Sequence, residues 1–105
     1  MRMLHISAVT TKKRVYFKLM AEQGNARAQT SLGFMYANGG GVPQDYILAH
    51  MWLNLAASRF PASEGEKRDM CVRNRDRVAS LMTPYQIAEA QRLAREWKPK
   101  DESGR

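Results

Sequence analysis

Apolar residues recur at helical spacing in two runs through the middle of the chain. In residues 26–38 they fall at i, i+4, i+7 and i+8, which is one face of a helix. These residues are Ala28, Leu32, Met35 and Tyr36. In residues 46–58 they fall at i, i+3, i+4 and i+7, at Ala49, Trp52, Leu53 and Ala56. The pattern predicts two amphipathic helices in succession.

The residues around these runs predict where the helices begin and end. Gly24 can end a preceding helix in the left-handed conformation, and Asn25 can cap the helix that follows. Gly39–Gly41 and Pro43 interrupt the helical pattern, because glycine is costly and proline lacks a donor in a helix interior. Asp45 can cap the second helix. The sequence therefore predicts an antiparallel αα-hairpin, which needs neighbours to bury both apolar faces.

The spacing of small, glycine and aromatic residues from position 21 to position 57 resembles the Sel1-like repeat, a relative of the tetratricopeptide repeat. The matching residues are Ala21, Gly24, Asn25, Ala28-Gln29, Leu32-Gly33, Tyr36, Gly39, Gly41-Val42, Asp45, Ala49, Trp52 and Ala56-Ala57. The resemblance implies an all-α fold, a short α/α solenoid of antiparallel helix pairs. It also implies a module that binds other proteins and has no catalytic chemistry.

The stretch before the hairpin, residues 13–23, reads as another helix. Shifting the hairpin back by thirty-six positions aligns Tyr16 with Trp52, Phe17 with Leu53, Leu19 with Leu55, Ala21 with Ala57 and Lys13 with Ala49. We therefore expect a partial repeat, the second helix of a preceding pair whose first helix is missing. Residues 1–12 carry no clear period, and we expect them to be extended or disordered and His5 to have no metal role.

After the full repeat, residues 25–58, the resemblance loosens, and residues 62–98 read as a divergent repeat and cap. Ser63 and Glu66 fit a capping box, which predicts a third helix from about Glu64 to Met82. Its apolar side carries Met70, Asn74, Val78, Leu81 and Met82. The other side interleaves Arg68, Arg73, Arg75 and Arg77 with Asp69 and Asp76. That side is either a solvated face or an anion-binding stripe.

A final helix is predicted by a clear local signal. Thr83 can cap it, Pro84 fits its first position, and Gln86 completes a capping box. One face then carries Ile87, Ala90, Leu93, Ala94 and Trp97. The segment resembles the one that follows the last Sel1-like repeat in many bacterial proteins, which implies that this C-terminal helix pair covers the open end of the stack. We expect residues 99–105 to form a flexible tail.

The charge is concentrated outside the central repeat. The chain of 105 residues is 44% hydrophobic and 26% charged, a composition that fits a single small domain rather than a disordered chain, and its net charge is +7. Basic residues gather in residues 1–20, which contain no acidic residue. An alternative function is therefore a basic helical protein that associates with nucleic acid or another polyanion, although we consider nucleic acid the less favoured partner.

The single cysteine, Cys71, excludes a disulfide within the chain and departs from the cysteine-rich secreted members of the family. We read it as a small buried hydrophobic residue. No apolar run is long enough for a signal peptide or a membrane span, so we expect a cytoplasmic protein without a membrane role.

No arrangement of residues supports catalysis, a metal site or a cofactor. His50 has no Cys, Asp or Glu at ligand spacing. Gly39–Gly41 lacks the Gly-Lys-Ser/Thr ending of a phosphate loop and reads as a turn between helices. The sequence therefore predicts no enzyme activity.

The non-core side of the first hairpin helix is a candidate partner-binding surface. Its residues are Arg27, Thr30, Phe34 and Asn38. The aromatic Phe34 fits an interface anchor, or it packs against an adjacent helix, and both readings stay open. Tyr16, Phe17 and Leu19 form an apolar patch on the preceding helix, where we expect self-association into a homo-oligomer. The sequence thus favours a non-catalytic protein-interaction module whose partner it does not name.

Overall fold

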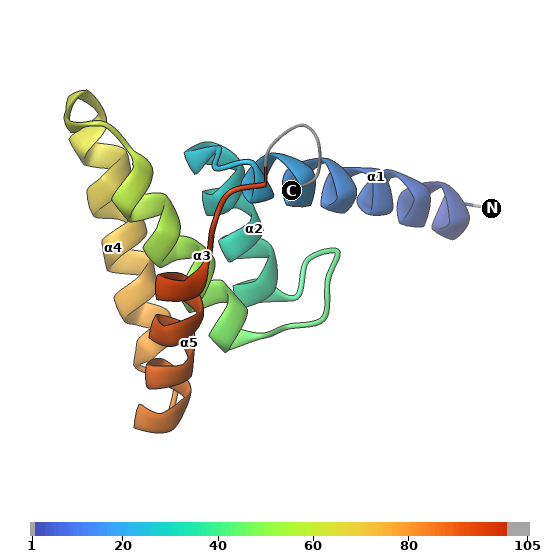
Figure 1. The fold of residues 1–105 in the computed structure, drawn as a ribbon. Coiled ribbons are helices and arrows are strands. Elements are labelled where there is room, and N and C mark those ends of the chain that lie inside the picture. The colour runs from blue at the N-terminus through green and yellow to red at the C-terminus, as the bar shows by residue number, and fades with distance from the viewer. Residues whose placement is uncertain (1, 101–105) are drawn as a thin grey trace.

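Residues 2–100, the part of the chain that the computed structural model describes, form helices and connecting turns and no strand (Figure 1). Side chains are described from Lys12 onward. The elements are α1 (Arg2–Glu22), α2 (Ala26–Asn38), α3 (Tyr46–Arg59), a 3₁₀ turn (Ala62–Glu64), α4 (Gly65–Ala79) and α5 (Pro84–Glu96). The all-α fold with antiparallel helix pairs is confirmed.

The predicted caps are present at the ends of α2 and α3. The Asn25 side chain accepts a hydrogen bond from the amide of Ala28 at 2.9 Å. The Asp45 carboxylate accepts one from the amide of Leu48 at 3.0 Å. Gly39 ends α2 at a φ of 72°, in the left-handed region where a side chain would be strained. Local sequence therefore fixes the ends of both helices.

Helix α3 is the centre of the molecule. It packs against α2, α4 and α5, while α1 packs against α2 (Figure 1). Leu32 of α2 and Leu53 of α3, at 1% and 0% exposure, are among the largest fully buried side chains. Trp52 is also buried. The predicted apolar stripes thus form the core, and their burial is the main source of stability.

The last helix closes one side of this core. The Thr83 hydroxyl accepts from the amide of Gln86 at 3.1 Å, and the Gln86 side chain accepts from the amide of Thr83 at 2.9 Å. The capping box is therefore confirmed. Helix α5 packs on α3, where Trp97 meets Trp52 edge to face with ring centroids 6.2 Å apart.

The first helix begins far earlier than the predicted start at Lys13. Residues 2–12, which we expected to be extended or disordered, are helical in α1. No glycine or proline occurs before Gly24, so a helix formed over residues 13–22 can extend backward by one hydrogen bond per residue. Met1 and the side chain of His5 lie outside the described part.

The third helix is shorter than predicted, at Gly65–Ala79. Ser63 lies inside the preceding 3₁₀ turn, so it does not occupy the position of a helix cap. No side chain caps α4, and the predicted capping box of Ser63 with Glu66 is wrong. The spacing of Ser63 and Glu66 fits a capping box. However, the residues after Pro61 form a 3₁₀ turn, so α4 begins one residue later than the predicted start at Glu64.

The beginning of the C-terminal tail lies against α1. The amide of Lys100 donates to the carbonyl of Glu22 at 2.7 Å, and the two side chains form an ion pair at 3.2 Å. This contact satisfies one of the carbonyls left free at the end of a helix. Residues 101–105, the rest of the expected flexible tail, lie outside the described part.

Candidate partner-binding surface

The four residues predicted to bind a partner on α2 lie in different environments. Arg27 and Asn38 are exposed. Thr30 is buried, donates to the carbonyl of Ala26 at 2.8 Å and lies 3.3 Å from the sulfur of Cys71 on α4. Helix α4 therefore covers the middle of the expected surface, and the four side chains do not form one open face.

Phe34 is half-buried. Its ring packs against the buried cluster of Ala49, Leu53 and Val78, which joins α3 to α4. Of the two readings of Phe34, this contact favours packing against an adjacent helix. A charge at this position is therefore expected to disturb the fold as well as any surface.

A shallow groove of about 290 Å³ opens between α2 and α4. Its lining is largely apolar, with two cationic side chains among the lining residues. The lining residues are Arg27, Thr30, Phe60, Lys67 and Met70. Two of them, Arg27 and Thr30, belong to the predicted stripe, so the groove includes part of that surface.

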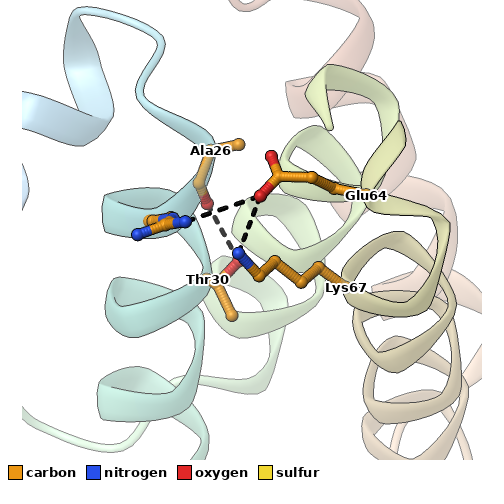
Figure 2. Close-up of polar contacts among 5 residues, drawn as sticks. Ala26, Thr30, Glu64 and Lys67 are labelled. Carbon is orange, nitrogen blue, oxygen red and sulfur yellow. Dashed lines mark hydrogen bonds and ion pairs between the residues drawn. The ribbon is translucent and has the colours of Figure 1, made fainter. Parts of the chain in front are cut away.

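The side of the groove carries a shared carboxylate (Figure 2). Glu64 accepts from Lys67 at 2.7 Å and from Arg27 at 3.5 Å. The hydrogen bond from Lys67, with the nearby positive charge, holds the pKa of Glu64 below its usual value. Two cations therefore share one anion, which leaves a net positive charge beside an apolar groove. The side chain of Arg27 is 72% exposed and thus free to meet another anion.

Cys71 lies under this groove. Its side chain is fully buried, and burial raises the pKa of the thiol. A thiol that stays protonated is a poor nucleophile, so Cys71 has a packing role here. This agrees with the reading of Cys71 as a small buried hydrophobic residue.

His50 lies on the buried side of α3. It is 3% exposed, and its Nδ1 atom has no hydrogen-bond partner among the described residues. Burial, with the positive charge of Arg75, lowers the pKa of the imidazole. Across the described side chains no group of three or more His, Cys, Asp and Glu residues has the geometry of a metal site.

Three residues of the groove were not predicted: Phe60, Lys67 and Met70. All three come after the hairpin, and their place depends on how α4 packs. The thirty-six-residue shift relates α1 to α3, and α4 follows α3 as α2 follows α1. That order of helices was the signal that could have placed α4 beside α2.

The expected self-association residues are placed differently from one another on α1. Tyr16 and Leu19 are 60% and 55% exposed. Phe17 is half-buried, packs against the core of α2 and α3, and meets the ring of Tyr16 edge to face at 5.5 Å. An accessible apolar surface thus exists on α1, although Phe17 is partly used by the fold.

Comparison with known proteins identifies the central hairpin. Residues 26–59 match the model of the Sel1 repeat, and they coincide with α2, α3 and the turn between them. No curated protein and no solved structure matches the chain. None of the helices in residues 2–100 is both long and apolar enough to cross a membrane. This chain therefore contains a Sel1 repeat, at residues 26–59.

Proposed function

We propose that the protein is a non-catalytic interaction module that binds a partner protein in the α2–α4 groove. Sel1 repeats generally mediate protein interactions. The observation that carries the proposal is the apolar groove of about 290 Å³ with Arg27 and Lys67 in its lining. Apolar surface supplies affinity, and the cations give the partner an orientation.

The groove favours a partner segment that combines an apolar side chain with a carboxylate. Met70, which is half-buried in the groove, offers apolar contact surface to this side chain. Because Arg27 holds Glu64 only at 3.5 Å, a partner carboxylate can take this guanidinium while Lys67 keeps Glu64. Asn38, at the end of α2, extends the surface beyond the groove. A cytoplasmic location is part of the proposal, because a free cysteine fits a reducing compartment.

The test compares two lysine-to-glutamate variants as baits in native lysate. Lys67→Glu reverses a charge inside the groove, whereas Lys98→Glu makes the same change on the exposed tail. We expect the partner captured by the unaltered protein to be lost with Lys67→Glu and retained with Lys98→Glu, with both variants folded by circular dichroism.

Equal capture by both variants would contradict the groove assignment. Recovery of nucleic acid in place of protein, with an affinity that falls steeply as salt rises, would favour the polyanion alternative instead.

A further inference from the structure

A second concave surface lies between α1 and α2, on the side away from α4. Two adjoining hollows of about 180 and 320 Å³ share Phe17 and Ser31 and together form one groove. Its α1 wall is a stripe at i, i+3, i+4 and i+7, made by Lys13, Tyr16, Phe17 and Met20. Its α2 wall includes Ala28, Ser31 and Met35. The groove is therefore a trough between two helices.

The internal repeat shows what such a trough holds. A shift of thirty-six positions carries α1 onto α3, and each of these helices is followed by a second one, α2 after α1 and α4 after α3. The α3 positions equivalent to Phe17 and Met20 are occupied by Leu53 and Ala56, which are both 0% exposed, as is Cys71 on the adjacent α4.

These residues of α3 and α4 are covered by another helix, α2. Gly33 of α2 lies so close to Leu53 that a Cβ there would be 2.8 Å from its Cγ, and Thr30 of α2 contacts Cys71. The trough between α3 and α4 thus receives a helix. In the α1–α2 trough no described residue takes that place, and Phe17, Met20 and Met35 stay half-buried.

Charge indicates what kind of helix fits. Lys13 lines one end of the trough and Arg27 the other. Arg14 and Lys18 add positive charge on α1, which carries no acidic residue before Glu22. Lys13 aligns with Ala49 of α3, which is small and buried. A helix docked in the α1–α2 trough therefore meets a positive charge at that end, and a carboxylate on it would pair with Lys13. A second copy of this chain, with its net charge of +7, adds like charge instead.

We propose that the α1–α2 trough binds an amphipathic helix of another protein, whose apolar stripe is flanked by acidic residues. The apolar stripe lies on Phe17, Met20 and Met35, and the acidic residues meet Lys13 and Arg27. A concave trough suits a helix with projecting side chains better than the plane of a membrane surface. This binding site shares Arg27 with the α2–α4 groove, but its other lining residues are different and it does not rest on that groove.

The test uses two synthetic helical peptides of about 18 residues, long enough to hold helical structure with capped ends. Both carry the same leucine stripe, and the flanking residues are glutamate in one and lysine in the other. Calorimetric titration of the full chain is expected to show binding of the glutamate peptide and at least tenfold weaker binding of the lysine peptide.

Two tyrosine variants locate the site. Tyr16→Ala removes a ring from the trough, whereas Tyr85→Ala removes a ring that is 79% exposed on α5. The glutamate peptide is expected to bind at least tenfold more weakly to Tyr16→Ala and unchanged to Tyr85→Ala. Met70→Ala, which alters the α2–α4 groove and none of the residues that line the trough, is expected to leave this peptide's affinity unchanged, so each proposal can fail without the other.

Several results would overturn the proposal. These are absence of glutamate-peptide binding at millimolar concentration, equal binding of both peptides, or equal effects of the two tyrosine variants. Sedimentation showing a dimer that Tyr16→Ala dissociates would assign the trough to a second copy. Binding to phosphatidylserine vesicles that Tyr16→Ala abolishes, with no peptide binding, would assign it to a membrane surface.

Discussion

Gly33 occupies a position where α2 lies in close contact with α3. A Cβ at this position would lie 2.8 Å from Leu53 Cγ and 3.0 Å from its Cδ2. Leu53 is fully buried, and protein interiors are close-packed, so it can move aside only by disturbing its neighbours. The absence of a side chain at Gly33 therefore sets the distance between the two helices of the repeat.

Gly33→Ala is expected to lower the free energy of unfolding by about 1–3 kcal/mol, because the added methyl overpacks the contact with Leu53. Urea unfolding followed by tryptophan fluorescence measures the change. Gly40→Ala is the matched control, since nothing lies within 4 Å of its added Cβ and its φ is not positive. A larger loss of stability in the control would contradict this explanation.

His50 makes stability depend on pH in a definite direction. Burial and the charge of Arg75 hold the pKa of its imidazole below 6.5, and Asp76 opposes them in part. The native state therefore favours the neutral ring, while the unfolded chain takes up a proton more readily. Its contribution to stability is complete above pH 6.5 and decreases as the pH falls toward the lower folded pKa.

We expect the free energy of unfolding to fall between pH 7.5 and pH 5.5, with a contribution from His50 of at most about 1.4 kcal/mol per pH unit. Denaturant titrations at both values measure it. His50→Gln keeps a polar side chain without the titration and should show a flatter dependence. An identical slope in the variant would show that other groups cause the effect.

At the scale of elements, the end of α3 ties the C-terminal segment to the turn between α1 and α2. The Nε of Arg59 donates to the carbonyl of Gly24 at 2.6 Å, and its guanidinium lies 5.6 Å from the centre of the Trp97 ring. Trp97 in turn packs on Trp52 of α3. Cation–π and aromatic contacts of this kind hold α5 in position on α3.

Trp97→Ala is expected to cost about 2–4 kcal/mol, because it removes a partly buried indole from both contacts. Thermal unfolding followed by circular dichroism measures the loss. Tyr85→Ala, also on α5 but 79% exposed, should change stability by no more than about 0.5 kcal/mol. Similar losses in the two variants would mean that α5 does not depend on the Trp97 contact.

Elements whose ends are fixed by local chemistry were predictable from the sequence. Asn25, Asp45 and Thr83 each cap a helix through hydrogen bonds within a few residues, and all three were identified. The packing of α4 over Thr30 was not, because it depends on contacts between distant residues. Of the residues predicted for the candidate surface, Arg27 lines the groove, whereas Phe34 lies against the core.

At the scale of the whole molecule, the core and the beginning of the chain differ in how many other helices they pack against. Helix α3 touches three other helices, whereas the N-terminal half of α1 extends beyond the rest of the molecule (Figure 1). An isolated helical segment of that length is marginal in water. The helix over residues 2–12 is therefore expected to unfold locally while the core stays folded.

Amide hydrogen exchange should show this directly. We expect protection in α3 to reach the free energy of global unfolding, and residues 2–12 to exchange close to the rate of an unstructured chain. Tryptophan fluorescence, which reports Trp52 and Trp97, should show a single cooperative transition. Strong protection of residues 2–12 would mean that this segment has a partner, such as a second copy, in solution.

The burial of Cys71 gives the protein a practical property. Its sulfur is covered by Thr30 and fully shielded from solvent, and the chain has no other cysteine. A maleimide dye added to the native protein therefore finds no accessible thiol. A cysteine introduced at an exposed position such as Ala88 would be labelled selectively, so fluorescent reporters can be attached without first replacing the natural residue.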